Sequence, residues 1–404
     1  MTTRLAQRLD VVKPSATLAV SARAAALRAE GRTIYPFGVG EPDFDTPVHV
    51  RDAAKAALDA GATRYTAVSG TLELRKAIAA QSTRTRGVPC KPDQVVVSVG
   101  AKHALFNLAI ALYEPGDEVI IPAPYWVSYP EQVRLVGATP VVVETTEADG
   151  FLLRPEALAA ALTPKTKAVI LCTPSNPTGG AYPRAWLQEI VDVMAQHDAF
   201  LIVDEIYASL VYDAFEQVSA LSLASDAARD RIIVIDGVSK TYAMTGWRIG
   251  WSITTAAIAK ALDVVQSQST TNPTALAQAA TIVALDGPQD SVRAMRDRFA
   301  TRRTLMVETL RTIPGVTCRM PEGAFYAFAD VRGLYGLPWA KAKSGKLDGD
   351  LEVATFLLEE AGCAAVPGSA FGAPGYLRFS YATSEQNIEA GLAAAKAAVL
   401  KARG

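Results

Sequence analysis

The sequence predicts an α/β fold, with a large domain built on a mostly parallel sheet between helices and a smaller α+β domain after it. Short apolar runs alternate with helical stretches, the runs are continuously apolar, and the pattern changes after about residue 286. Continuous apolar runs are typical of strands buried on both faces, as in a parallel sheet. The 404 residues, half of them hydrophobic, also exceed what one core usually holds.

The first predicted helix covers about residues 16–30. Thr46 is expected to cap the next helix, with Pro47 at its first position, and this helix continues to Gly61. Seven strand-like runs follow, over residues 94–99, 118–122, 139–144, 167–172, 199–204, 231–236 and 250–254. Helical stretches lie between several of these runs, over residues 102–112, 155–162 and 185–197. This order predicts strand–helix–strand units.

A long charged helix over residues 289–311 opens the C-terminal part. Three separated strands follow, over residues 315–320, 324–330 and 376–382. We therefore predict an N-terminal segment (1–46) that packs with the small domain, a large domain (47–285) and a small domain (286–404).

The bulk properties exclude several classes of protein. A net charge of −1 provides no basic surface for DNA or an anionic membrane. No apolar run approaches the roughly 18 residues of a membrane span, and the N-terminus lacks a signal peptide's apolar core. A transit peptide is a less favoured alternative. The four cysteines are far apart, with no spacing for a metal site, so we expect free thiols and a cytoplasmic protein.

Polar signatures follow four of the predicted strands. Ligands of open α/β sheets bind beyond the carboxyl ends of the strands. The signatures there are Gly100-Ala101-Lys102, "TPSNPTGG" at 173–180, "DEIY" at 204–207 and "GVSK" at 237–240. Each has an ordinary explanation as a helix cap or a solvated side chain. Together they predict one ligand crevice.

Asp204 and Lys240 suggest the ligand. A carboxylate at the end of an apolar strand is costly unless it meets a cation or a proton donor. Partial burial of Lys240 would lower the pKa of its amine and make it a nucleophile. Pyridoxal 5'-phosphate (PLP) fits this pair, with its aldehyde at one end and a cationic ring nitrogen at the other. Its phosphate would be held by residues 100–102, Ser239 and Arg248.

Several motifs resemble those of the class I aminotransferases of PLP fold type I. They are "SNPTGG", "DEIY", a Ser-Lys pair followed by "TGWRIGW", and "YLRFSYA". The motifs "KPSATLAV", "GEPDFDTP", "YWVSYPE" and "QSQSTT" narrow the resemblance to the bacterial aspartate aminotransferase subgroup 1β, some of whose members also aminate prephenate. The resemblance runs from about residue 8 to the C-terminus. It implies a transaminase that converts L-aspartate and 2-oxoglutarate into oxaloacetate and L-glutamate in two half-reactions.

The resemblance also implies roles for residues around the cofactor. Lys240 would form the Schiff base with PLP, and Asp204 would pair with the ring nitrogen. Tyr207 and Asn176 would hydrogen-bond the 3-oxygen of the ring, and Trp126 would stack on its face.

Substrate contacts follow from the same resemblance. Arg378 would bind the α-carboxylate, assisted by Asn176 and the backbone of Gly40. Lys102, aided by Thr17, would bind the distal carboxylate, because "QSQSTT" lacks the arginine that animal enzymes use there.

Three further positions depend on the resemblance. Tyr65 resembles a tyrosine that reaches the phosphate in the neighbouring subunit, which implies a homodimer with shared sites. Lys13 resembles a position associated with prephenate, although a solvated lysine is an equal alternative. Gly237 stands where many members have a phosphate-binding serine, so Ser239 or backbone donors would substitute.

Other functions stay open as alternatives. One is a bifunctional aspartate/prephenate enzyme, and another is a different reaction on the same cofactor, such as decarboxylation, β-elimination or transamination of aromatic or alanine-type substrates. A PLP-sensing DNA-binding regulator is disfavoured, since only about 13 residues precede "KPSAT" and the net charge is −1. A catalytically inactive binding protein is disfavoured because the chemical positions match the family.

Overall fold

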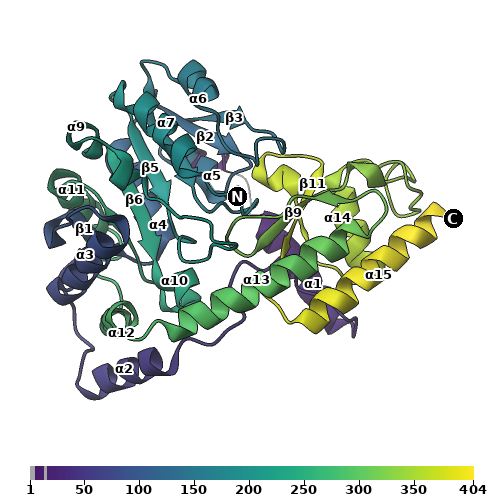
Figure 1. Ribbon diagram of the computed structural model, residues 1–404, viewed down its shortest axis with the longest axis horizontal. Coiled ribbons are helices and arrows are strands. Elements are labelled where there is room, and N and C mark those ends of the chain that lie inside the picture. Colours follow the sequence, from purple (N-terminus) through teal and green to yellow (C-terminus); the bar gives the residue numbers. More distant parts are fainter. Residues whose placement is uncertain (1–4, 13–15) are drawn as a thin grey trace.

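The computed structural model describes residues 5–12 and 16–404, and within them it contains two sheets (Figure 1). The larger sheet has seven strands in the order β1-β7-β6-β5-β4-β2-β3. Their bounds are β1 Val95–Ser98, β2 Glu118–Ala123, β3 Thr139–Glu144, β4 Thr166–Cys172, β5 Phe200–Asp204, β6 Ile232–Gly237 and β7 Gly250–Ile253. Only β7 runs antiparallel to its neighbours, β1 and β6. The predicted mostly parallel sheet is confirmed.

Alternate side chains of strands β1 and β6 enter two different cores. Val96 and Ile233 pack with α4 Ala101–Leu112, α5 Ser128–Leu135 and α11 Ala256–Ser267. Val97 and Val234 pack with the helices of the other face. Those helices are α2 Val48–Asp59, α3 Leu72–Arg86, α7 Arg184–Ala195, α8 Ala220–Leu223, α9 Asp226–Arg229 and α12 Ala275–Asp286. Burial on both faces explains why these runs are continuously apolar.

Two details of the prediction are wrong. Strand β3, at one edge of the sheet, is only half-buried to exposed along its length, whereas β1 at the other edge is buried. Helix α2 begins at Val48 and is capped by Pro47, not by Thr46. The Thr46 hydroxyl instead donates to the carbonyl of Ala243 at 2.7 Å and accepts from the indole of Trp247 at 3.0 Å.

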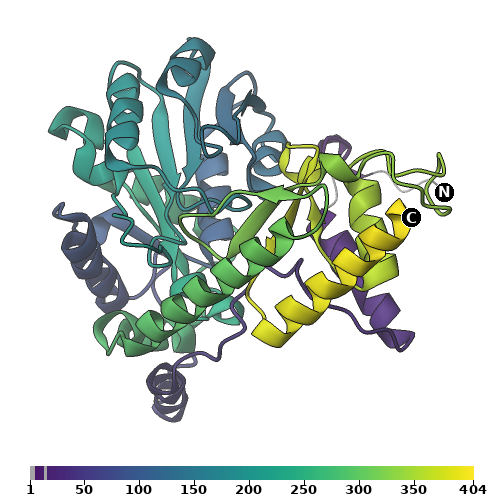
Figure 2. The same ribbon diagram turned by 45° about the vertical axis from the view of Figure 1, so that its right-hand side comes forward.

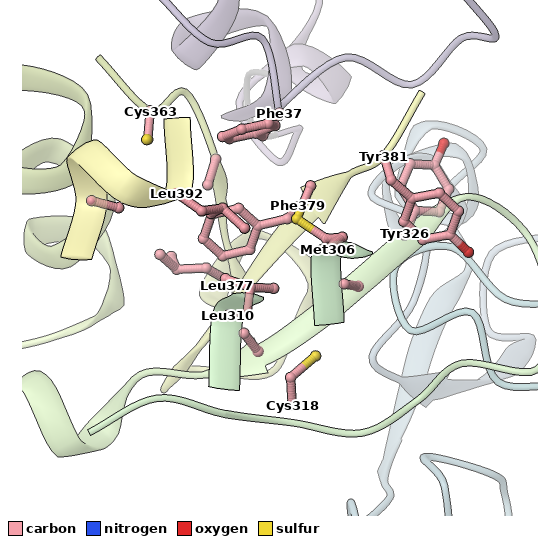
Figure 3. Close-up of a cluster of buried hydrophobic side chains, with 14 of the residues drawn as sticks. Phe37, Met306, Leu310, Cys318, Tyr326, Cys363, Leu377, Phe379, Tyr381 and Leu392 are labelled. Carbon is pink, nitrogen blue, oxygen red and sulfur yellow. The ribbon is translucent and has the colours of Figure 1, made fainter. Parts of the chain in front are cut away.

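The smaller sheet is antiparallel, in the order β10-β11-β9-β8. Its strands are β8 Thr317–Cys318, β9 Tyr326–Asp330, β10 Val366–Pro367 and β11 Tyr376–Ser380. Helices α13 Asp290–Arg311, α14 Asp350–Ala361 and α15 Glu385–Arg403 cover it. Figure 3 shows the core that they share, with Met306 and Leu310 of α13 beside Leu377 and Phe379 of β11.

The N-terminal segment joins this smaller unit. Helix α1 Ala16–Ala29 buries Ala24 and Leu27 against Leu358 and Ala364. Helix α13 runs from the large sheet toward the smaller one in both views (Figures 1 and 2). The domain limits at residues 46 and 285 stay predictions. No helix in the described ranges is both long and apolar enough to cross a membrane.

Candidate active site

The two units share a cavity of about 340 Å³. Its wall combines residues from the carboxyl ends of β4, β5 and β6 with side chains of β9 and β11. The predicted site residues on this wall are Gly40, Ala101, Lys102, Trp126, Asn176, Asp204, Tyr207, Ser239, Lys240, Arg248 and Arg378. Gly100 directly precedes the wall residue Ala101. Tyr65 is 89% exposed and lies away from the wall, whereas Lys13 and the side chain of Thr17 fall outside the described residues.

Lys240 is placed by a short helix, α10 Val238–Thr241, that follows β6 directly. The residue is half-buried, and its Nζ donates to the carbonyl of Gly40 at 2.5 Å. Burial lowers the pKa of this amine to about 8, with Glu41 opposing the change and nearby arginines adding to it. The amine is therefore neutral, and nucleophilic, at pH values where an ordinary lysine is charged.

Asp204 ends β5 and is buried. Its Oδ2 accepts from the hydroxyl of Tyr129 at 2.7 Å, and its Oδ1 accepts from the amide of Ile206 at 3.3 Å. Burial raises the pKa of this carboxyl to about 6, while the two hydrogen bonds oppose the rise. Burial and the charge of Asp204 hold the pKa of Tyr129 well above its usual value, so the hydroxyl stays protonated and donates. Asp204 can thus serve as the anionic partner of a buried cation.

Arg378 lies in β11 and is 2% exposed. Its Nη1 donates to Oδ1 of Asn176 at 2.9 Å, and its Nη2 donates to the carbonyl of Gly38 at 2.8 Å. The guanidinium also lies 4.5 Å from the ring centroid of Tyr326. Its Nε is buried and has no hydrogen-bond partner in the described chain. A buried arginine with neutral acceptors and an unused donor is suited to bind a carboxylate.

The start of α4 and Arg248 form a second place for an anion. Gly100, the residue before α4, has φ of +88°, and no side chain caps the helix. A Cβ at this position would lie 2.4 Å from Nη2 of Arg248, so only glycine lets the guanidinium approach the helix start. Arg248 donates to the carbonyls of Thr245 at 2.8 Å and Val99 at 3.2 Å. Free amides at a helix N-terminus beside an arginine suit a phosphate.

Trp126 presents a flat apolar surface to the cavity. Its ring packs edge-on against Tyr129, with the centroids 5.3 Å apart and the planes at 79°. Nζ of Lys102 lies 4.9 Å from the centroid of Trp126. Burial and the charge of Arg248 lower the pKa of Lys102. A planar ligand on Trp126 would therefore have a cation beside it.

The charges on the wall are strongly unbalanced. Lys102, Lys240, Arg248 and Arg378 line the cavity, and none of them forms an ion pair within the described residues. Asp204 is the one carboxylate that the described chain contributes to the wall. This excess of positive charge suits ligands that carry phosphate and carboxylate groups. The cavity thus combines an amine, a carboxylate and the anion site at the start of α4, and this combination fits PLP together with an amino acid.

The sequence left two site residues unassigned. Tyr129, the partner of Asp204, stands three residues after Trp126 in "YWVSYPE", a spacing that could have placed it on the same side of the chain. The hydroxyls of Tyr326 and Tyr207 lie 2.9 Å apart. Tyr326 follows a run of small and aromatic residues, which gave no signal of a polar role.

Comparisons with known proteins agree on one family. The family model described as "Aminotransferase class I and II" matches residues 32–394. An aspartate/prephenate aminotransferase of Cereibacter sphaeroides is 46% identical over 383 residues, which cover 95% of each chain. The crystal structure of an aspartate aminotransferase from Rhizobium meliloti superposes with a TM-score of 0.94 at 43% identity, covering 98% of this chain and 99% of that one. The Thermus thermophilus aspartate aminotransferase with maleate gives a TM-score of 0.91 at 41% identity, covering 98% and 100%.

Proposed function

Since the chain belongs to the class I and II aminotransferases, which are PLP-dependent enzymes, we propose that it transfers an amino group from L-aspartate to 2-oxoglutarate, giving oxaloacetate and L-glutamate. One observation carries this proposal. Lys240 and Arg378 enter the same cavity as cations without a carboxylate partner in the described chain, and Asp204 lies in the same wall. An amine for the cofactor and a guanidinium for the substrate are the two groups that transamination requires.

Three sets of residues would hold the cofactor. Bound PLP supplies an aldehyde that combines with amines and a protonated ring that withdraws electrons. The amine of Lys240 would bind the aldehyde, and the carboxylate of Asp204 would keep the ring nitrogen protonated. The amides at the start of α4, with Arg248 and Ser239, would bind the phosphate.

Arg378 would bind the α-carboxylate of the amino acid. Its position between Asn176 and Gly38 fixes the guanidinium plane, so little side-chain entropy is lost on binding. Because Oδ1 of Asn176 already accepts from Arg378, the amide nitrogen of Asn176 is left to donate to a ligand oxygen. Tyr207, on the same wall, would donate to the 3-oxygen of the PLP ring.

Lys240 would also move the proton. Its lowered pKa, about 8, gives it enough neutral amine to take a proton from the α-carbon of the substrate. The same Nζ, then charged, can return a proton when the product forms. The position of the substrate on Arg378 keeps the α-carbon within reach.

An acidic substrate is supported by Lys102. It is the remaining cation of the wall once Arg378 is assigned to the α-carboxylate, Lys240 to the aldehyde and Arg248 to the phosphate. The Thermus thermophilus relative was solved with maleate, a dicarboxylate. We therefore assign the distal carboxylate of the substrate to Lys102, with Thr17 as its predicted helper.

Prephenate is a second candidate acceptor. The relative from Cereibacter sphaeroides is named for both aspartate and prephenate. Prephenate also carries two carboxylates, so Arg378 and Lys102 could bind it by the same contacts. Lys13 keeps its predicted role in this activity.

A homodimer is part of the proposal. The ring of Tyr65 is 89% exposed in the single chain. Lys102 and Arg248 also border a second hollow of about 540 Å³ beside the site, which gives a second chain room to reach them. We assign Tyr65 to the phosphate of the partner's site. The four free cysteines suit a reducing compartment, and we place the enzyme in the cytoplasm.

A transamination assay on the purified enzyme tests the proposal. L-Aspartate and 2-oxoglutarate should give oxaloacetate and L-glutamate, and prephenate should be compared with 2-oxoglutarate as the acceptor. Lys240→Ala should abolish turnover. The variant should lose the visible absorption band of the covalent bond to PLP, while an equilibrium titration should still show that PLP binds. Turnover of this variant near the wild-type rate would refute the assignment of Lys240.

A further inference from the structure

Three charged side chains form a buried cluster behind the active site. Nε of Arg86 lies 2.8 Å from Oε2 of Glu205, and its Nη2 lies 2.8 Å from Oδ2 of Asp236. The three side chains, here called the Arg86 triad, are 5%, 3% and 11% exposed. Ser219 donates to Glu205 at 2.6 Å, and the amide of Gly237 donates to Asp236 at 2.7 Å. The triad is outside the cavity wall and has no role in the proposed chemistry.

The triad connects the two strand ends that carry Asp204 and Lys240. Glu205 directly follows Asp204, and the two carboxylates meet partners on different elements, Arg86 and Tyr129. Asp236 lies in β6, four residues before Lys240. Arg86 is the last residue of α3, so a single guanidinium joins a helix to the ends of β5 and β6.

The energetics indicate that the triad fixes geometry. Buried ion pairs add little net stability, because the loss of hydration offsets their attraction. Nη1 of Arg86 is also buried without a hydrogen-bond partner in the part of the chain that the structure describes. A planar guanidinium held by two carboxylates at 2.8 Å nevertheless sets the spacing of the groups that it joins.

We propose that Arg86 is a positioning residue that fixes Asp204 relative to Lys240, so that one PLP molecule can contact both at once. This inference rests on the proposed roles of Asp204 and Lys240. It deepens the proposed function, because the fit of the cofactor then depends on a side chain that does not touch it.

Three ligands test the proposal on cofactor-depleted enzyme. PLP needs both Asp204 and Lys240. The PLP analogue with C–H in place of the ring nitrogen gains nothing from Asp204, and pyridoxine 5'-phosphate, which lacks the aldehyde, cannot bond to Lys240. In Arg86→Met, the affinity for PLP should fall by about tenfold or more, while the affinities for the two analogues change much less. Equilibrium titration measures all three.

A matched control separates positioning from a general loss of stability. Arg303 is similarly buried, contacts Asp213 and the carbonyl of Pro321, and also has a buried Nε without a partner in the described residues. Arg303→Met should leave the ratio of the three affinities unchanged. If Arg86→Met does not fold, Arg86→Lys keeps the charge but cannot bridge both carboxylates, and the same selective loss is expected.

The possible results are distinct. A loss confined to PLP supports the proposal. Equal losses for all three ligands, a matching loss for pyridoxine 5'-phosphate, or no loss would overturn it. Failure of the wild-type enzyme to prefer PLP over both analogues would instead refute the proposed function.

Discussion

Replacing Tyr129 by phenylalanine should make PLP binding more sensitive to acid. The hydroxyl of Tyr129 donates to Oδ2 of Asp204 at 2.7 Å and stabilises the charged carboxylate. Burial already raises the pKa of Asp204 to about 6. Without the donor this pKa should rise further, so the carboxylate of the variant takes up a proton nearer to neutral pH. A neutral carboxyl cannot pair with the cationic ring nitrogen.

The size of the effect follows from this hydrogen bond. A buried hydrogen bond to a charged group contributes about 1.5–3 kcal/mol, and one pKa unit corresponds to about 1.4 kcal/mol. The pKa of Asp204 should therefore rise by roughly 1–2 units, from about 6 to about 7–8. We compare the dissociation constant of Tyr129→Phe for PLP with that of the wild type. If PLP binds only the charged form of Asp204, the ratio of the two constants is close to one at high pH. It should rise as the pH falls and level off below about 6 at roughly 10- to 100-fold.

Titration of cofactor-depleted enzyme with PLP between about pH 5.5 and 9 measures this ratio. The ionisations of PLP itself cancel, because both proteins bind the same ligand. Tyr182→Phe is a matched control, since its buried hydroxyl accepts from the amide of Leu153 at 2.8 Å and does not contact Asp204. A ratio that stays constant over the whole pH range would refute the role assigned to Tyr129.

Three other substitutions or conditions test the site. Gly100→Ala should weaken PLP binding about tenfold, because the new Cβ meets Arg248 and a φ of +88° strains alanine; unchanged affinity in a titration would contradict this. Arg378→Lys should raise the KM for the amino acid by roughly 10- to 100-fold, because lysine lacks the planar guanidinium, and the affinity for PLP should stay unchanged. An unchanged KM together with a weaker affinity for PLP would argue against a carboxylate at this arginine. The rate of PLP uptake should rise with pH and level off above about 8, the pKa of Lys240. A stopped-flow rate that keeps rising to about pH 10 would indicate an ordinary lysine.

The strands of the large sheet were predictable because burial on both faces leaves a continuous apolar run. Strand β3 shows the limit of this argument, since "TPVVVE" is equally apolar but forms an exposed edge. Strand order alone does not decide that difference, because β1 at the other edge is buried under α3, α4 and α11. Packing by helices from elsewhere in the chain decides it, and no single run records that packing. Thr46 has the residue type of a cap, yet contacts with Ala243 and Trp247, far along the chain, direct its side chain elsewhere.

The residues of the site also differ in whether the sequence alone can predict their roles. Lys240 and Asp204 are recognisable because a charged group directly after an apolar strand is costly to bury unless it has a partner or a function. Tyr129 and Tyr326 carry no charge, so only the folded positions of their hydroxyls reveal their partners. Arg86 stands at a helix C-terminus, where arginine is common, and its burial depends on two carboxylates that lie more than a hundred residues away in the chain.

A short piece of main chain, residues 38–40, contacts both Arg378 and Lys240. The carbonyl of Gly38 accepts from Arg378, and the carbonyl of Gly40 accepts from Lys240. A covalent bond between Lys240 and the cofactor would replace the contact with Gly40, whereas Arg378 would keep its contact with Gly38 while it binds a carboxylate. By reciprocity, whatever holds Gly40 more firmly against Lys240 would lower the affinity for the cofactor. The N-terminal segment would thus be coupled to cofactor binding, although it supplies none of the reacting groups.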